Sequence, residues 1–584
     1  MCGIIGYIGS RNGTELVFDG LKRLEYRGYD SAGIALVKDG KLLVKKDVGK
    51  LAEVHEKLNL STPPSGLVIG HLRWATHGKV TRENAHPHID CLGEIAIVHN
   101  GIIENALELR KFLEGRGHKF RSGTDTEVVA HLVEEFSKDL NFEEACKQAF
   151  SKLRGSFAIL AISPREEKIV GIRKDSPLVI GINDNEIFAA SDIYALLPYT
   201  KNFIFLQNYD VAILEKHGFK IENLIDGINV RRPIEKVDVE VSEDEKGNYH
   251  HYMIKEILEQ ADVFERAVSG NEEEINELAN LIKEAGKIIF VAAGTSYHAS
   301  LAASYLLAKA GTLSKSIIAS EFKNFEQLID KDTLVIAVSQ SGETADVLDA
   351  VRIAKRKGAK IFSIVNVYGS SLTRESHDFL LMNAGFEIGV AATKTYIAQL
   401  AIFLKLYSKL AGKNFNPKII KSKILELLGR SRREFISKVA ERLKDEEHIF
   451  LIGRGLQYVT ALEAALKIKE ISYIHAEAFP GGEIKHGTIA LIEKSTPCIV
   501  FVGREDRKLI LSNAEELKAR GGYIIGVSER KEEAFDIWVK TPEDSEFSLI
   551  YQIIPIQLLA YQLAVLKGLD PDKPRNLSKS VTVP

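Results

Sequence analysis

A repeated strand–helix–strand pattern in the last two thirds of the chain most narrows what it can fold into. The stretch TLVIAVSQSGETADVLDAVRIAKRKGAKIFSIV begins at Thr333, and TPCIVFVGREDRKLILSNAEELKARGGYIIGVS begins at Thr496. Thr333 and Thr496 lie 163 positions apart, as do Gly358 and Gly521, so the copies align without a gap. Apolar runs such as LVIAV are typical of strands buried on both faces. The alternation of strands and helices therefore predicts two parallel α/β sandwiches, over about 270–425 and 426–575.

The first 237 residues follow a different pattern. Short β-branched runs such as GIIGYIG and LVIGHLRWAT are bounded by Gly, Asn or Asp, which is typical of strands and the turns between them. Apolar residues at helical spacing in EVVAHLVEEF predict a helix that starts near Thr126. We predict an α+β domain over 1–237, a linker over the charged, Gly-containing stretch 238–250, and a C-terminal segment over 576–584.

Length, charge and cysteine content argue against several classes of protein. A chain of 584 residues is too long for one hydrophobic core, and a net charge of −3 argues against a general nucleic-acid binder. We find no signal-peptide pattern and expect no apolar block of about 18 residues that spans a membrane, so we predict a cytoplasmic protein. The cysteines are Cys2, Cys91, Cys146 and Cys498. They form no CxxC pair, which fits a reducing compartment and predicts no metal site.

The cysteine at position 2 has two interpretations. If Met1 is removed, Cys2 carries a free α-amino group with a pKa of about 7.7–8.0. That amine can accept the thiol proton and later donate it, so one residue supplies both a nucleophile and a general base. A lone cysteine here is otherwise an ordinary small apolar residue of an edge strand. The polar motifs that follow decide between the two.

Three motifs bring together groups that recognise an amino acid. HLRWATHG contains Arg73, whose guanidinium suits a carboxylate. VHNGIIEN places Asn100 and Gly101 after a strand, where an amide and a backbone N–H can form an oxyanion hole. SGTDTE places Asp125 before a helix, where it can bind an ammonium group or cap the helix. Together with Cys2, these groups predict hydrolysis of the side-chain amide of a free amino acid.

These motifs, together with RLEYRGYDSAGIA and NAHPH, closely resemble the N-terminal-nucleophile (class II) glutamine amidotransferase domain over about 237 residues. The resemblance implies that Cys2 is the nucleophile and that Asn100 and Gly101 form the oxyanion hole. The residues that it implies as contacts of glutamine are Arg73, Thr76, His77 and Asp125.

Two turns of the first repeated copy carry hydroxyl side chains between a strand and a helix. AAGTS supplies Thr295 and Ser296. VSQSGET supplies Ser339, Gln340, Ser341 and Thr344. Helix N-termini expose backbone N–H groups, and short hydroxyls add donors without bulk, so such turns suit a phosphate. Ordinary helix capping is the alternative, but two such turns in succession favour a phosphate. Neither GxxxxGK[ST] nor GxGxxG occurs here, which argues against a nucleotide loop.

The second copy contributes groups that can act on a sugar. ALKIKEISYIHAEAFPGGEIKHG contains Glu470 and His486, and PRNLSKSVTVP contains Lys579. A lysine can form an imine with a ketone, and a carboxylate can move a proton between neighbouring carbons. The alternatives are a surface charge on a helix for Glu470 and a solvated tail for Lys579.

The duplicated segments resemble the sugar-phosphate isomerase (SIS) domain pair. Joined to the amidotransferase domain, they imply an enzyme that transfers the amide nitrogen of glutamine to fructose 6-phosphate and isomerises the product to glucosamine 6-phosphate. The resemblance implies that Lys579 forms the imine and that Glu470 shuttles a proton between C1 and C2. It implies that His486 assists ring opening and reaches a neighbouring subunit's site. The other implied roles are phosphate binding by VSQSGET, sugar contacts from Thr295 and the backbone near Val390, and an ammonia gate at Trp74.

The resemblance requires no metal and no organic cofactor, and it suggests a homodimer through the SIS domains. Two alternatives stay open. One keeps the glutaminase and changes the acceptor, as in phosphoribosyl amidotransferases; VSQSGET and the duplicated sandwich argue against it. The other is a non-catalytic sugar-phosphate sensor. Cys2, Glu470 and Lys579 argue against a sensor, because binding alone needs none of them.

Overall fold

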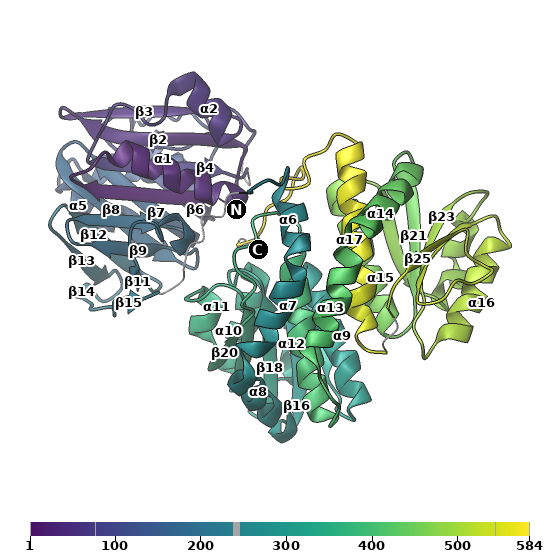
Figure 1. The fold of residues 1–584 in the computed structure, drawn as a ribbon. Coiled ribbons are helices and arrows are strands. Elements are labelled where there is room, and N and C mark those ends of the chain that lie inside the picture. Colours follow the sequence, from purple (N-terminus) through teal and green to yellow (C-terminus); the bar gives the residue numbers. More distant parts are fainter. Residues whose placement is uncertain (1, 76–77, 238–245, 543–544, 583–584) are drawn as a thin grey trace. The chain divides into compact units, whose positions relative to one another are not determined.

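The computed structural model describes residues 2–75, 78–237, 246–542 and 545–582. The chain forms two compact units (Figure 1). The N-terminal unit comprises residues 1–243 with 580–584, and the C-terminal unit comprises residues 244–579. Residues 238–245 of the predicted linker lie outside the described residues.

Two antiparallel sheets form the centre of the N-terminal unit. The strands of the first sheet are β1 Gly3–Gly9, β2 Ser31–Lys38, β3 Lys41–Val48, β4 Leu67–Arg73, β9 Val179–Asn183, β10 Glu186–Ala190, β11 Asn202–Phe205 and β15 Glu235–Lys236. Those of the second are β5 His88–Ile89, β6 Ala96–Ile103, β7 Gly155–Ser163, β8 Glu166–Lys174, β12 Asp210–Glu215, β13 Gly218–Asn223 and β14 Ile228–Asn229. In the part of the chain that the structure describes, the strand orders are β15-β11-β9-β10-β1-β4-β2-β3 and β14-β13-β12-β8-β7-β6-β5.

Helices lie on the outer face of each of these sheets. α1 (Gly13–Leu24) packs on β1 and β4, whereas α4 (Glu127–Phe136) and α5 (Phe142–Phe150) pack on the second sheet. The two sheets face each other across a shared apolar cluster that includes Ile69 and Leu160. The other helices are η1 Glu25–Arg27, α2 Leu51–Leu58, α3 Ala106–Glu114 and η2 Ile193–Ala195. The layers run helix, sheet, sheet, helix, which confirms the predicted α+β domain.

The central strand β1 fixes the position of Cys2. β1 lies between β4 and β10, and all seven of its residues are buried. Neighbouring strands hold both edges of β1, and apolar side chains cover both of its faces. The positions of the residues at its two ends are therefore fixed. Cys2 is the residue that enters this strand.

The helix predicted from the EVVAHLVEEF pattern is confirmed. α4 begins at Glu127 with Thr126 as its N-cap residue. Its apolar residues, Val129 and Val133 among them, pack into the cluster beneath the second sheet. The polar residues just before this helix, including Asp125, are therefore held at a fixed helix end.

The C-terminal unit contains two parallel sheets with the same strand order. The first consists of β16 Lys287–Ala292, β17 Lys315–Ile318, β18 Thr333–Ser339, β19 Lys360–Val365 and β20 Asp378–Leu381. The second consists of β21 His448–Gly453, β22 His475–Pro480, β23 Pro497–Phe501, β24 Tyr523–Ser528 and β25 Ile537–Lys540. Among the described residues, the orders are β17-β16-β18-β19-β20 and β22-β21-β23-β24-β25. The two predicted parallel sandwiches are thus confirmed.

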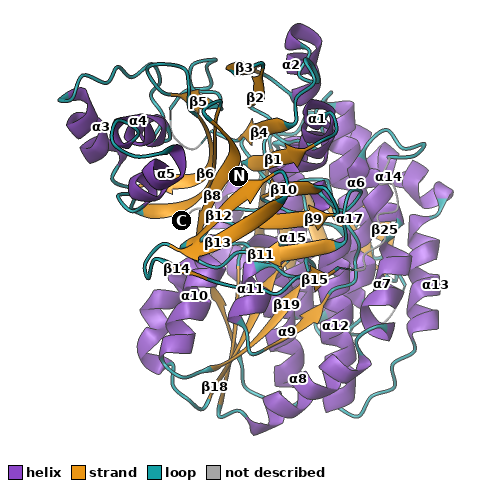
Figure 2. Cartoon of the chain, turned by 90° about the vertical axis from the view of Figure 1, so that its left-hand side faces the viewer, coloured by secondary structure: helices purple, strands orange, loops and turns teal. Residues whose placement is uncertain are grey.

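Helices cover both faces of each parallel sheet, and Figure 2 shows α9 and α12 beside strands of the first one. The helices are α6 Tyr252–Leu258, α7 Gln260–Ser269, α8 Glu272–Glu284, α9 Gly294–Lys309, η3 Ala319–Leu328, α10 Ala345–Arg356, α11 Ser371–Glu375, α12 Lys394–Leu410, α13 Pro417–Leu428, α14 Arg430–Leu443, α15 Leu456–Ser472, η4 Glu483–His486, η5 Thr488–Leu491, α16 Arg507–Lys518 and α17 Ser548–Leu566. In β18, Leu334 and Ile336 join one apolar cluster, and Val335 and Ala337 join the cluster on the opposite face. This two-sided burial explains the unbroken apolar run of the strand.

The helix α17 corrects the expectation that no apolar block of about 18 residues exists. It has 19 residues, and an 18-residue stretch of it has a mean hydropathy of 1.7 and is 83% buried. It packs against α6, α13, α14 and α15, in an apolar cluster that also contains residues of the first parallel sheet. Its composition is that of a core helix shared by both sandwiches.

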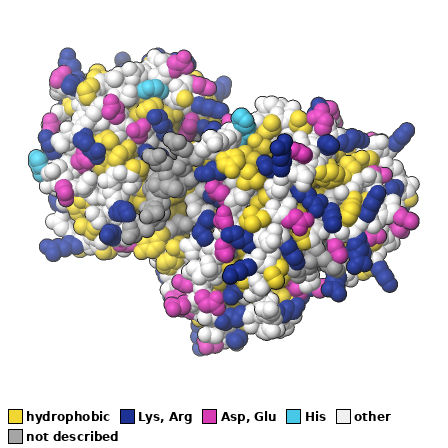
Figure 3. Space-filling model, viewed as in Figure 1, with side chains coloured by type: hydrophobic (Ala, Val, Ile, Leu, Met, Phe, Trp, Pro, Cys, Tyr) yellow, Lys and Arg dark blue, Asp and Glu magenta, His cyan; other side chains and the backbone are white. Residues whose placement is uncertain are grey.

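Charges of both signs are spread over the surface. On the face shown in Figure 3, Lys and Arg side chains are interspersed with Asp and Glu side chains. A nucleic-acid backbone is recognised by a broad basic patch. This face therefore gives no support to a nucleic-acid partner.

Candidate functional site

Cys2 lies where the central strand β1 meets the end of β4. The antiparallel register pairs Gly3 with Leu72, so Cys2 lies beside Arg73 and Trp74. The Trp74 N–H donates a hydrogen bond to Cys2 Sγ at 3.4 Å, and Sγ lies 3.5 Å from the Trp74 carbonyl oxygen. Burial raises the pKa of the Cys2 thiol. The thiol is therefore protonated at neutral pH, and it needs a base before it can attack.

Asn100 and Gly101, the predicted oxyanion hole, belong to β6. The Asn100 side-chain amide donates to the Cys2 carbonyl oxygen at 2.9 Å. Gly101 has a φ of +119°, and a Cβ there would lie 2.0 Å from the Ser156 carbonyl oxygen. Glycine alone fits this position. The structure thus brings the predicted nucleophile and the Asn100 amide together.

Two of the predicted glutamine contacts, Arg73 and Asp125, act electrostatically on the Cys2 thiol. Arg73 is buried, and its guanidinium donates to two backbone carbonyl oxygens at 3.2 Å each. Asp125 is half-buried, and its Oδ2 accepts a backbone N–H at 2.7 Å. A cation and an anion thus lie near the thiol, as the carboxylate and ammonium groups of an amino acid require. The other predicted glutamine contacts, Thr76 and His77, lie outside the described residues.

The predicted phosphate turns lie at the carboxyl ends of two neighbouring strands. β16 pairs with β18 in parallel, so the turns before α9 and α10 meet at one edge of the sheet. Ser339 Oγ accepts the Gly342 N–H at 3.0 Å and shares a hydrogen bond with Thr344 Oγ1 at 3.0 Å. Ser341 Oγ accepts a backbone N–H at 3.2 Å, and Gln340 is half-buried. These short polar side chains form a compact turn in front of α10.

The two residues of the AAGTS turn point to different partners. Ser296 is buried, and its Oγ accepts a hydrogen bond from Gln399 Nε2 at 3.0 Å. Thr295 Oγ1 instead donates to Glu463 Oε1 at 3.1 Å and accepts from Lys467 Nζ at 3.2 Å. Thr295 therefore links the first sandwich to α15 of the second.

Glu470 belongs to a buried network of charges on α15. Lys467 Nζ forms ion pairs with Glu470 Oε1 and, at 3.3 Å, with Glu463 Oε1. Burial raises the pKa of Glu470, and Glu463 adds to that rise, whereas Lys467 and Lys579 oppose it. A carboxyl group with a raised pKa suits proton transfer near neutral pH.

Lys579 is buried in an ion pair rather than solvated in a tail. Its Nζ donates to Glu387 Oε2 at 2.5 Å and to the Gly389 carbonyl oxygen at 2.8 Å. The Lys579 side chain is 3% exposed, and that of Glu387 is 0% exposed. Val390 lies in the same segment, and its N–H donates to the Asp572 carbonyl oxygen at 3.1 Å. The structure therefore brings Lys579 and the backbone near Val390 together.

His486 stands apart from this group. It is the last residue of η4, and its side chain is exposed. The structure thus leaves this predicted site residue at the surface of the C-terminal unit, whereas Glu470 and Lys579 act on each other electrostatically within it.

Two glutamates near Lys579 carried no sequence signal. Glu387 accepts hydrogen bonds from the N–H groups of Thr393 and Thr395 at 2.9 and 3.1 Å, besides its pair with Lys579. Burial opposes its ionisation most strongly, but the charge of Lys579 and the hydrogen bonds from Lys579 and Thr395 together outweigh burial, and the pKa of Glu387 is lowered. Glu256 on α6 is also buried, and its Oε1 accepts two backbone N–H groups of the 387–390 segment. The surrounding sequence, KEILEQ, is typical of an exposed helix face and therefore gives no sign that Glu256 is buried.

Glu256 should make the C-terminal unit lose stability as the pH rises. Burial, and then the charge of Glu387, raises the pKa of Glu256 from 4.5 to about 7. Between those values the folded state binds more protons than the unfolded state, so the free energy of unfolding falls as the pH rises. Relative to Glu256→Gln, the wild type should lose about 2.5 kcal/mol between pH 5 and pH 8. Denaturant unfolding of both proteins at several pH values measures this difference.

A matched control uses an exposed carboxylate of the same unit. Glu284→Gln removes a solvated charge from α8 and should leave the pH dependence of the wild type unchanged. If the free energy of unfolding changes equally with pH in the wild type and in Glu256→Gln, Glu256 does not titrate in this range.

Comparisons with known proteins match both units. A family model described as a glutamine amidotransferase domain matches residues 71–198, and one described as a SIS domain matches residues 281–409 and 442–567. A glutamine–fructose-6-phosphate aminotransferase (isomerizing) of Pyrococcus horikoshii is 47% identical over 599 residues, and one of Thermococcus kodakarensis is 48% identical over 605 residues. Each alignment covers 100% of both chains.

A solved structure resembles the C-terminal part of the chain. It is the C-terminal domain of glucosamine-fructose-6-phosphate aminotransferase from Francisella tularensis. Its sequence is 35% identical, and its TM-score is 0.52. The match covers 56% of this chain and 99% of that structure.

Proposed function

Because the chain belongs to the glutamine–fructose-6-phosphate aminotransferase (isomerizing) family, we propose that it transfers the amide nitrogen of glutamine to fructose 6-phosphate and isomerises the product to glucosamine 6-phosphate. Glutamate is the second product. The buried Lys579–Glu387 pair best supports catalysis of the sugar step, because a buried lysine amine can form an imine with the ketone of the sugar.

In the glutaminase step, Cys2 Sγ attacks the side-chain amide carbon of glutamine. This step requires that Cys2 is the first residue of the mature protein, because its α-amine then takes the thiol proton. Asn100 Nδ2, which lies beside Cys2, stabilises the oxyanion together with the Gly101 N–H. Ammonia leaves with the proton, and water hydrolyses the thioester to glutamate. Arg73 and Asp125 hold the carboxylate and ammonium groups of glutamine.

In the sugar step, the VSQSGET turn holds the phosphate. Lys579 Nζ attacks C2 of the open-chain sugar and forms an imine with loss of water. Glu387, which accepts a hydrogen bond from Nζ, orients the lysine, and the ammonium proton passes to solvent before the attack. Ammonia then displaces the lysine and leaves a C2 imine, Glu470 moves a proton from C1 to C2, and the C1 hydroxyl proton passes to the imine nitrogen as the C1 carbonyl forms. The product is the aldose with an amine on C2.

Several finer points belong to the same proposal. We propose a homodimer in the cytoplasm, with His486 assisting ring opening in the site of a second copy; its exposure leaves it accessible to such a partner. Trp74, whose backbone contacts Cys2 Sγ, is proposed as the ammonia gate. Sedimentation of the purified protein tests the dimer.

The first test follows the nitrogen atom. Purified protein is incubated with amide-¹⁵N glutamine and fructose 6-phosphate, and the products are identified by mass spectrometry. We expect ¹⁵N-labelled glucosamine 6-phosphate and glutamate in equal amounts. Glutamate without an amino sugar would mean a different acceptor. Sugar-phosphate binding with neither product would mean a non-catalytic sensor.

A further inference from the structure

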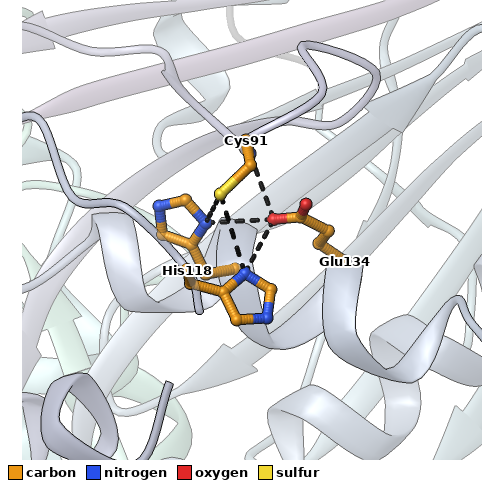
Figure 4. Close-up of side chains that lie close together, drawn as sticks. Cys91, His118 and Glu134 are labelled. Carbon is orange, nitrogen blue, oxygen red and sulfur yellow. Dashed lines mark hydrogen bonds and ion pairs between the residues drawn. The ribbon is translucent and has the colours of Figure 1, made fainter. Parts of the chain in front are cut away.

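Four side chains from three segments of the N-terminal unit meet at one point that the proposed reaction does not use. They are Cys91, His118, His131 and Glu134. One ligand atom from each lies within 4.8 Å of all the others. Figure 4 shows Cys91, His118 and Glu134 pointing toward one another. Both histidines are buried, and Cys91 and Glu134 are partly buried.

The spacing of these atoms is close to that of ligands around one small ion. Glu134 Oε2 lies 2.9 Å from His118 Nδ1 and 3.1 Å from His131 Nδ1. Cys91 Sγ lies 3.8 Å from His118 Nδ1 and 3.5 Å from His131 Nδ1. Around a tetrahedral Zn²⁺ with ordinary Zn–N and Zn–S lengths, ligand atoms are about 3.3–3.6 Å apart. Small adjustments of side chains would give this geometry.

An outer carboxylate lies beside the second nitrogen of each imidazole ring. His118 Nε2 lies 3.0 Å from Glu135 Oε2, and His131 Nε2 lies 3.6 Å from Glu127 Oε1. The His118 Nε2–H can therefore donate to Glu135 while its Nδ1 lone pair faces the centre, as in carboxylate–histidine–metal arrangements, whereas His131 Nε2 faces Glu127 beyond hydrogen-bond distance. Without a cation at the centre, His118 has a carboxylate within hydrogen-bond distance of both ring nitrogens, and a neutral ring cannot donate to both.

We propose that Cys91, His118, His131 and Glu134 bind one Zn²⁺ ion in a tetrahedral structural site. A thiolate and two imidazoles favour zinc over Mg²⁺ or Ca²⁺, which prefer oxygen ligands. Four protein ligands leave no open position for a substrate, so the role is structural. The proposal replaces the prediction of no metal site. In the sequence, only His131 and Glu134 lie at a spacing that places two ligands on one helix face. No known zinc-binding motif joins them to Cys91 and His118, so the cluster becomes visible only in the fold.

The ion would fasten three segments together. Cys91 follows β5, His118 lies in the loop before α4, and the other two ligands lie on α4 itself. The same loop contains Ser122, whose N–H donates to Glu127 Oε2 at 2.7 Å. Loss of the metal should therefore loosen the loop and the start of α4 without removing any catalytic group.

Metal content and cobalt spectra test the site on the tag-free, full-length protein. We expect about one Zn²⁺ per chain by elemental mass spectrometry. After the zinc is removed, titration with Co²⁺ should give the visible absorption of a tetrahedral ion and a near-ultraviolet thiolate-to-cobalt band. Binding of less than about 0.1 metal per chain, or an octahedral cobalt spectrum in the wild type, would overturn the proposal without any variant.

Matched cysteine variants identify the ligand. Cys91→Ala should lose the thiolate band and bind Zn²⁺ at least about 100-fold more weakly. Cys146→Ala removes a buried thiol of the same unit that lies outside the cluster, and it should keep both properties. An unchanged thiolate band in Cys91→Ala would exclude Cys91. These readouts do not depend on glutamine or sugar turnover, so the site can fail while the proposed function stands.

Discussion

Replacement of Lys579 by arginine should lower the formation of glucosamine 6-phosphate by at least about 10³-fold, because the imine can no longer form. Arginine keeps a positive charge beside Glu387, so the carboxylate stays paired, but a guanidinium does not lose its proton and is not a nucleophile. Basal hydrolysis of glutamine should stay within about twofold, since Cys2 belongs to the other unit. Amino sugar and glutamate measured in the same reaction give both values.

A second lysine provides the control for this experiment. Lys413 also pairs with a glutamate, Glu546, at 2.8 Å, but its side chain is 48% exposed. Lys413→Arg should leave both activities at the wild-type level. Lys579→Ala is harder to interpret, because it leaves Glu387 buried without its cation and can destabilise the fold as well as remove the amine. Amino-sugar synthesis at the wild-type rate in Lys579→Arg would remove the imine role.

Cys2→Ala should lower glutamine hydrolysis by at least about 10⁴-fold, because the nucleophilic sulfur is gone while the α-amine and the substrate contacts remain. Conversion of fructose 6-phosphate to glucose 6-phosphate, an isomerisation that needs no ammonia, should persist in the C-terminal unit. Glutamate release and sugar-phosphate conversion are measured separately on the same preparation.

The control for this variant is a thiol with no proposed part in the chemistry. Cys146→Ala, in the interior of the N-terminal unit, should keep glutamine hydrolysis. The intact mass of the wild type must also show that Met1 has been removed, since the proposed base is the α-amine of Cys2. Persistent hydrolysis by Cys2→Ala would assign the nucleophile elsewhere.

The fold of the C-terminal unit follows closely from its repeat. β18 and β23, which begin at Thr333 and Pro497, take the same place in their sheets. α10 and α16 follow them within one residue of the predicted 163-residue offset. Buried parallel strands give unbroken apolar runs, and this strong local signal explains why the two sandwiches could be predicted from the sequence. The apolar helix α17 was missed because its glutamines and tyrosines interrupt a purely apolar run.

The sites were less predictable than the fold. Local motifs predicted Cys2, Asn100 and the VSQSGET turn as candidate site residues, because short polar motifs beside apolar strands are visible in sequence. The pairing of Lys579 with Glu387 joins residues 192 positions apart. No local pattern encodes such a contact, and the same is true of Glu256. Tertiary packing, which creates the low dielectric around these charges, decides their chemistry.

The position of α17 affects how the protein is made. A ribosome adds about 5–20 residues per second, so α17 is complete roughly 5–20 s after α15, which ends at Ser472. Until then the apolar faces of α13, α14 and α15 that α17 covers remain open to water. The nascent chain offers a chaperone a binding surface during this interval. The two sandwiches, although they repeat one another, reach their final packing together when the last helix arrives.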